Sequence, residues 1–297
     1  MKAKSKDNWI GECKLCLKRK ELLDSHYLGA ALYKIAKKRG GSLVRTPELF
    51  LESDIQIHHH LFCGNCEQLF NKYGERYVIT MMNRGEGDFP LLKIMDESTP
   101  IAFDPNNVPV FSSLEIGVDT VKLAYYALSM FWRGSVHSWK TLGGQTTSVY
   151  LNPGDQEAIR RFLIGEIRWP PGIVVQVAAC TDTISQDNVL APANFRNKLG
   201  CSMVMYGILF DIFCGVQSGS SDWNLCCVNS PARVIFRHTN EEETREQLDD
   251  LERAGGPGLR VQSPPQLGCP RACTERSRKP ALSLPKGIPR FWGPGRE

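Results

Sequence analysis

Two Cys-x-x-Cys pairs, Cys13 with Cys16 and Cys63 with Cys66, constrain the fold of this chain more than any other feature. A tetrahedral Zn²⁺ ion takes four soft or borderline ligands, and two such pairs supply four thiolates at the spacing that structural zinc sites use. We therefore predict a structural Zn²⁺ ion bound by all four cysteines. The alternative is that the spacing is coincidental in a chain that contains 11 cysteines.

Length and composition indicate a chain that can fold around a full hydrophobic core. It has 297 residues, enough for one or two domains. No run approaches the roughly 18 consecutive apolar residues of a membrane helix, and the N-terminus lacks the apolar run of a signal peptide. Five central cysteines lack framework spacing, as expected of small buried hydrophobes in a reducing compartment. We therefore expect a cytoplasmic protein without membrane contact; the five are Cys180, Cys201, Cys214, Cys226 and Cys227.

Positive charge concentrates around the first cysteine pair. Residues 13–45 contain nine Lys and Arg side chains against two acidic ones, Glu21 and Asp24. A zinc-binding segment with this excess of positive charge predicts a surface that faces the phosphates of a nucleic acid. The alternative is an ordinary solvated helix face. The nine residues are Lys14, Lys18, Arg19, Lys20, Lys34, Lys37, Lys38, Arg39 and Arg45.

Residues 1–90 are predicted to form a zinc-nucleated unit. Its helices are expected at 30–39 and 64–73, the second ending at Gly74, because apolar residues recur there at helical spacing. Its strands are expected at 21–23 and 55–62. A knuckle, a β-hairpin and a helix whose first turn supplies the last two ligands is the treble-clef arrangement.

Residues 91–254 are predicted to form an α+β domain, so the fold class of the whole chain is α+β. The predicted helices lie at 118–133, 155–166 and 241–253, and the predicted strands at 172–180, 202–213 and 232–236.

Residues 255–297 differ in composition from the rest of the chain. Gly and Pro account for 15 of these 43 residues, above the level of a folded segment and without a period. We expect a disordered tail that extends the reading frame beyond the native protein.

The sequence Cys-Lys-Leu-Cys, followed by Asp-Ser-His and then by Leu-Phe-Cys-Gly-Asn-Cys-Glu, resembles a family of uncharacterised bacterial proteins. The treble clef of that family is similar to the one in HNH endonucleases. The resemblance is firm over residues 11–77 and loose to about residue 250. It implies a structural zinc, and a hairpin histidine that acts as a general base beside a catalytic Mg²⁺ or Mn²⁺ ion.

Carried over to this chain, the resemblance makes His26 the general base. The residue before it, acidic or His in many HNH enzymes, is Ser25, and the acid lies one step earlier at Asp24. Glu67 and Asn71, at i and i+4 on one helix, would complete the ion site, since glutamate can ligate Mg²⁺ or Mn²⁺. The alternative is structural: His26 orders the hairpin by hydrogen bonding, and Glu67 caps the helix N-terminus.

Three consecutive histidines, His58, His59 and His60, precede the second cysteine pair. In a strand they alternate between faces, so at most two could converge on one ion. A surface or hairpin role is therefore expected.

These features predict a zinc-binding protein that acts on nucleic acid. It would be either a divalent-metal-dependent endonuclease of a defence system or mobile element, or a non-catalytic module that binds DNA or protein. The discriminating feature is whether Asp24 or Ser25 can surround one ion together with His26 and Glu67.

Overall fold

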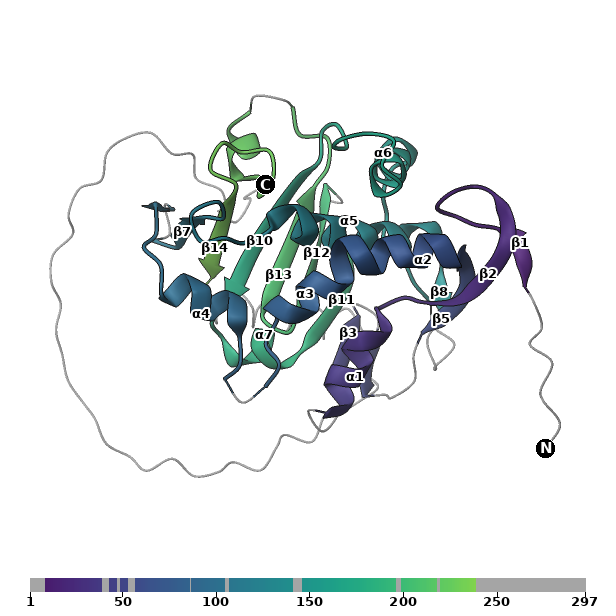
Figure 1. Cartoon of the computed structure of the whole chain (residues 1–297), viewed down its shortest axis with the longest axis horizontal. Helices are drawn as coiled ribbons and strands as arrows, with labels where there is room; N and C mark the ends of the chain where they lie inside the picture. The colour runs from purple at the N-terminus through teal and green to yellow at the C-terminus, as the bar shows by residue number, and fades with distance from the viewer. Residues whose placement is uncertain are drawn as a thin grey trace, which may run out of the picture.

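The computed structural model describes residues 9–38, 43–46, 49–52, 57–85, 87–104, 107–140, 146–195, 199–217 and 220–238. The predicted helix at 241–253 and the predicted tail at 255–297 lie outside these ranges. The described part of the chain contains no helix that is long and apolar enough to cross a membrane. The fold is mixed α+β, as predicted (Figure 1).

A nine-stranded sheet with the order β4-β3-β11-β12-β13-β10-β14-β7-β6 forms the larger part of the fold (Figure 1). Its pairs are antiparallel except for β3 with β11 and β10 with β14. The strands are β3 (Leu43–Thr46), β4 (Leu49–Glu52), β6 (Ala102–Phe103), β7 (Pro109–Ser112), β10 (Val174–Cys180), β11 (Val189–Asn194), β12 (Gly200–Met205), β13 (Ile208–Phe213) and β14 (Val234–His238).

The apolar run at 202–213, predicted as one strand, forms the hairpin of β12 and β13. The turn residues Tyr206 and Gly207 have φ values of 44° and 89°. A positive φ at both central residues matches the right-handed twist of the flanking strands in a two-residue hairpin. Tyrosine is an unusual residue at such a position, so the turn carries little sequence signal and the prediction of a single strand was wrong.

Helix α5 (Thr120–Val136) lies between the sheet and the other helices (Figure 1). Asp119 caps it by accepting a hydrogen bond from the backbone N–H of Lys122. Because 13 of its 17 residues are buried, it must be covered nearly all round. It contacts β10, β11 and β13 on the sheet, and α2, α3 and α6 among the helices. The predicted helix at 118–133 is confirmed.

A continuous helical segment follows the second cysteine pair. It consists of α2 (Gly64–Phe70), the π-helical turn η1 (Asn71–Glu75) and α3 (Arg76–Met81). The prediction that this helix ends at Gly74 was wrong. Gly74 is buried, and a Cβ added there would lie 2.9 Å from the Cα of Tyr126. The glycine therefore allows η1 to approach the backbone of α5 and does not end the helix.

A second, three-stranded sheet carries the cysteines. Its antiparallel order is β1 (Ile10–Glu12), β2 (Arg19–His26) and β5 (His58–Cys63). Its core residues belong to the same hydrophobic cluster as those of α5 and the large sheet. The division of the chain at residue 90 stays a prediction, and packing is continuous across it.

The remaining elements cover the edges of these layers. The predicted helices at 30–39 and 155–166 correspond to α1 and α6. The elements are α1 (Ala30–Lys38), α4 (Pro90–Asp96), α6 (Pro153–Leu163), α7 (Thr183–Asp187), the 3₁₀ turn η2 (Ser221–Leu225), and the two-stranded sheet of β8 (Trp139–Lys140) and β9 (Thr146–Thr147).

Replacing Gly74 by Ala tests the contact between η1 and α5. In an open helix this change would stabilise by about 1 kcal/mol, because alanine is the better helix former. Here the added methyl meets the backbone of Tyr126, so we expect a destabilisation of about 1–3 kcal/mol in urea unfolding. Gln68→Ala, at an exposed position of α2, is the control and should change stability little. An increase in the stability of the Gly74 variant would contradict the close approach.

Candidate metal centre

Four cysteine sulfurs converge where β2, β5 and α2 meet. The Sγ atoms of Cys13, Cys16, Cys63 and Cys66 all lie within 4.8 Å of one another. The Cys16 and Cys63 sulfurs are 3.9 Å apart, and those of Cys63 and Cys66 are 3.6 Å apart. Four sulfurs around a tetrahedral Zn²⁺, each at about 2.3 Å, would be about 3.8 Å apart. The four side chains can hold one metal ion, and their spacing fits zinc.

The first pair lies on a tight turn between β1 and β2. The backbone N–H of Leu17 donates to the carbonyl of Cys13 at 2.8 Å, and the N–H of Cys13 donates to the carbonyl of Lys18 at 3.0 Å. Leu17 adopts a φ of 57°, a left-handed conformation that costs a non-glycine residue roughly 1–2 kcal/mol. This turn directs both thiols of the pair toward the second pair.

The second pair lies at the junction of β5 and α2. Cys63 ends β5 and is the N-cap residue of α2, and Cys66 lies in the first turn of that helix. The backbone N–H of Cys63 donates to Cys13 Sγ at 3.3 Å. An N–H aimed at a sulfur stabilises the thiolate form that a metal requires.

The environment shifts the pKa values of three of the four thiols in different directions. The hydrogen bond from Cys66 lowers the pKa of Cys13 to about 4, and further hydrogen bonds reinforce the shift against burial. The same hydrogen bond, together with burial, raises the pKa of Cys66. Burial also raises the pKa of Cys16. All four groups can be thiolates together only when a cation neutralises them, as a bound metal ion does.

Arg160 on α6 ties the first turn to the rest of the protein. Its guanidinium Nη1 donates to the carbonyl of Leu15 at 2.9 Å, between the two cysteines of the first pair. Glu157 accepts from Arg160 Nε at 2.7 Å and keeps the guanidinium in place. The side chain of Leu15 is fully buried. The metal-binding turn is thus anchored to α6 by a charged hydrogen bond and by packing.

A buried ionic cluster lies beside the second pair. Arg133 of α5 is 1% exposed, and its Nη2 lies 2.8 Å from Glu75 Oε1 and 3.8 Å from Glu67 Oε2. Its Nη1 donates to the backbone carbonyl of His26 at 3.5 Å. The guanidinium carbon lies 4.1 Å from the centroid of the Phe70 ring. One cation therefore connects α5 with β2, α2 and η1.

The residues predicted to form a catalytic site lie in different surroundings. The His26 ring faces Tyr33 and His58, at centroid distances of 6.5 and 6.1 Å. The Glu67 carboxylate faces Arg133. Asn71 is exposed on η1. Within the described ranges, the four cysteines form the only group of three or more His, Cys, Asp or Glu side chains that could hold an ion.

Asp24 and Ser25 point to opposite sides of β2. Ser25 is 1% exposed, and its hydroxyl accepts from the backbone N–H of Phe62 at 3.2 Å and donates to the carbonyl of Leu23 at 3.3 Å. Asp24 is half exposed and its Oδ1 lies 2.6 Å from Nδ1 of His58. Neither side chain shares an ion-binding group with Glu67.

The three consecutive histidines have separate neighbours. His58 pairs with Asp24. The His59 ring stacks on His137 at 4.3 Å, and the His60 ring stacks on Trp9 at 4.8 Å. The three rings therefore do not converge on one ion.

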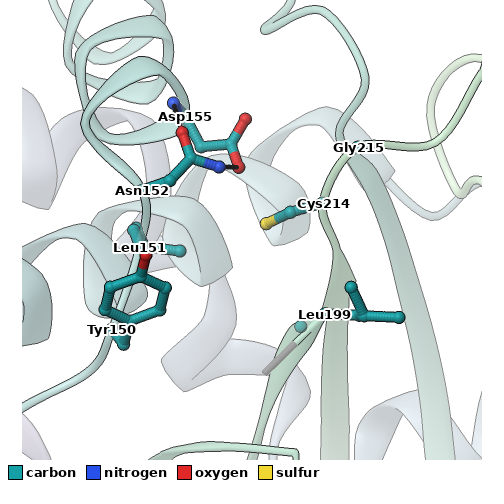
Figure 2. A pocket seen from close by; sticks show the side chains of 8 residues that line it. Tyr150, Leu151, Asn152, Asp155, Leu199, Cys214 and Gly215 are labelled. Atoms are coloured by element: carbon teal, nitrogen blue, oxygen red, sulfur yellow. Dashed lines mark hydrogen bonds between the residues drawn. The ribbon is translucent and has the colours of Figure 1, made fainter. Parts of the chain in front are cut away.

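A small hollow of about 170 Å³ lies between α6 and the end of β13, and Figure 2 shows the side chains that line it. Its polar groups already have structural tasks: Asn152 caps α6 and donates to the carboxylate of Asp155. Burial, with the neighbouring charge of Asp155, raises the pKa of Cys214 to about 12, so its thiol is protonated and unreactive. Ligand sites are larger, at roughly 300–1,000 Å³. We therefore place the functional site at the metal centre.

Comparison with family models, with curated proteins and with solved structures gave no match to this chain. The interpretation of the site therefore rests on its own geometry.

Sequence reasoning missed Arg133, Arg160 and Glu75. Arg133 on α5 and Arg160 on α6 are far in sequence from the cysteines they support, whereas Glu75 lies on η1, the continuation of the helix that carries Cys66. The only signal was an arginine at the end of the apolar run of α5, where a charge has to find a buried partner.

Metal content tests the four-cysteine centre. Freshly purified, reduced protein should contain about one zinc ion per chain by elemental analysis. Cys66→Ser should lose the ion and lower the melting temperature, because the metal contributes folding free energy. Cys180→Ser, at a buried cysteine outside the centre, is the control and should keep the zinc. Zinc-free wild-type protein would remove the basis of this assignment.

Removing the buried cation tests the ionic cluster. Arg133→Met keeps much of the side-chain volume but leaves two carboxylates unpaired, so we expect a loss of about 3–5 kcal/mol in the free energy of unfolding. Arg161→Met removes an exposed arginine that lies 3.4 Å from Glu166 and should cost no more than about 1 kcal/mol. Equal effects of the two changes in denaturant titrations would show that the cluster does not hold the helices together.

Proposed function

We propose that this protein is a zinc-stabilised nucleic-acid-binding module. The hairpin of β1 and β2, the strand β5 and the start of α2 would form a treble clef similar to that of HNH endonucleases. Four thiolates at a spacing that fits Zn²⁺ support the zinc, and the order of the elements around them supports the treble clef.

The observation that carries the proposal is the positive charge on the metal-binding turn. Lys14, Lys18 and Arg19 are exposed, and none of them takes part in the ion pairs of the described residues. Cations without an acidic partner can bind phosphates without first breaking an ion pair. Two exposed apolar side chains accompany them, Trp9 at 58% and Leu17 at 52% exposure. Aromatic rings beside cations suit the stacking of unpaired bases.

Helix α1 supplies a second group of cations. Lys34, Lys37 and Lys38 are exposed on it, and the last two lie in its final turn. Lys20 on β2 is half-buried, and Arg39 and Arg45, the other two members of the predicted basic segment, lie outside the residues whose side chains are described.

The endonuclease hypothesis keeps one supporting observation. Oε1 of Glu67 is buried and has no hydrogen-bond partner among the described residues, so this oxygen could meet an Mg²⁺ or Mn²⁺ ion. Against it, the other oxygen of Glu67 faces Arg133, Asp24 pairs with His58, and the His26 ring has different neighbours. The binding module therefore has the stronger support.

Charge reversal tests the proposed binding surface. Replacing Lys14, Lys18 and Arg19 together by Glu should weaken binding to duplex DNA alike for all sequences. The plot of log affinity against log salt concentration has a negative slope. Its magnitude should decrease by about 2–3, because each phosphate contact contributes about 0.9. The measurement is fluorescence anisotropy at several salt concentrations, with zinc content checked in each sample.

A matched triple variant tests whether the loss of DNA affinity comes from the turn itself or only from the change in net charge. Replacing Arg76, Lys93 and Arg168 by Glu changes the net charge equally at exposed positions away from the turn. It should affect the salt slope far less. Equal weakening by both variants would contradict a binding surface at the turn, and Mg²⁺-dependent cleavage that is lost in Glu67→Gln would favour the endonuclease.

A further inference from the structure

Histidines gather at the zinc-bearing hairpin. The chain contains six, and only His238 lies elsewhere; the others are His26 on β2, His58, His59 and His60 on β5, and His137 after α5. Imidazole is a ligand for Zn²⁺, Cu²⁺ and Ni²⁺, so we asked which of these rings could share an ion.

The strand register places His26 directly opposite His58. Directly paired residues of antiparallel strands project on the same face, with Cβ atoms about 4.5–5.5 Å apart. Ser25 and Tyr27, which flank His26, are buried on the core face, so the two histidines lie on the outer face of the ribbon. Their ring centroids are 6.1 Å apart.

Asp24 fixes the tautomer of His58. Its Oδ1 lies 2.6 Å from Nδ1 of His58, and an ionised carboxylate can only accept a hydrogen bond. Nδ1 therefore carries a proton, and in the neutral imidazole the lone pair is on Nε2. A metal-binding histidine typically donates its second ring N–H to a carboxylate in this way, which orients the ring and makes it a stronger ligand.

The distance between the rings fits a shared ion. With metal–nitrogen distances of about 2.0–2.1 Å, each ring centroid would lie about 3.2 Å from the ion. The two centroids would then be about 5.2 Å apart at a tetrahedral angle and about 6.4 Å apart in a linear arrangement, and the observed 6.1 Å lies between these limits. Both side chains of the Asp24–His58 pair are about half exposed, at 49% and 50%, so an ion can reach them.

We propose that the outer face of the β2–β5 ribbon binds a second divalent transition-metal ion, with His26 and His58 as ligands and Asp24 as the carboxylate that orients His58. Water would complete the coordination shell. This site is separate from the four-cysteine centre, because its ligands are imidazole nitrogens and the His26–His58 pair lies at the opposite end of the β2–β5 pairing from Cys63. It also differs from the predicted Mg²⁺ or Mn²⁺ site, because it uses neither Glu67 nor Asn71.

The other histidines are not part of this site. The His59 and His137 rings stack nearly parallel at 4.3 Å and an interplanar angle of 13°, and His60 stacks on Trp9. His59 therefore provides a control on the same strand, one residue from His58 but on the opposite face.

Nickel binding tests the proposal. Full-length protein with zinc in the cysteine centre is titrated with Ni²⁺ by isothermal titration calorimetry, and we expect one further ion to bind. His58→Gln and His26→Gln should each weaken this binding at least tenfold, and Asp24→Asn should weaken it about tenfold, the lower end of the effect of removing such a carboxylate. His59→Gln should bind as the wild type does.

Two further measurements keep the outcome decisive. Zinc release and sulfur-to-nickel charge-transfer absorption are followed during the titration, and nickel bound through the cysteines would overturn the proposal. Equal nickel binding by the wild type and His58→Gln, or equal loss in His59→Gln, would overturn it as well. Because the His58 side chain is half exposed, that variant should fold even if His26→Gln does not. DNA affinity is measured separately, so failure of this site leaves the proposed binding function unaffected.

Discussion

A buried guanidinium joins the three-stranded sheet to the helix that lies on the nine-stranded sheet. Arg133 is 1% exposed, and a charge removed from water costs several kcal/mol unless anions and hydrogen-bond acceptors surround it. Its partners come from three other elements: it forms ion pairs with Glu67 on α2 and Glu75 on η1, and it donates to the carbonyl of His26 on β2. These elements must therefore pack against α5 together, and α5 itself lies on the nine-stranded sheet.

This packing makes the four-cysteine site, which could hold a metal ion, part of a larger cooperative unit. Small zinc domains have too little core to fold alone, so metal binding and folding are coupled in them. Here the cysteines Cys13, Cys63 and Cys66 belong to the same hydrophobic cluster as α5, and Arg160 holds the carbonyl of Leu15. Loss of the metal would release a turn whose Leu17 is held in a left-handed conformation. We infer that packing against α5 and the hydrogen bond from Arg160 supply part of the stabilisation of the cysteine site. In smaller zinc domains the metal has to supply it alone.

Local sequence patterns were sufficient to predict the cysteine cluster and several helices. The cysteine spacing predicted the four residues that converge, and apolar periodicity predicted α1, α5 and α6, because both depend on residues close in the chain. The errors came from tertiary contacts. In the sequence alone Gly74 indicates a helix end, but in the structure it is needed for close contact with the backbone of Tyr126. The turn at Tyr206 is imposed by strand pairing. Arg133 and its carboxylates could not be paired from sequence, since they meet across the core.

The β2–β5 ribbon explains why neighbouring residues of one motif have different roles. Because side chains alternate along a strand, Ser25 lies in the core, where its hydroxyl accepts a hydrogen bond from the backbone N–H of Phe62. Asp24 lies on the outer face beside His58. The predicted catalytic ion would need the acid, His26 and Glu67 together, but Asp24 pairs with His58 and the Glu67 carboxylate faces Arg133. The same alternation brings His26 and His58 together on the outer face. The ribbon therefore carries two separate groups of side chains: the four cysteines, which could hold one metal ion, and the outer-face pair of His26 and His58, for which we propose a second.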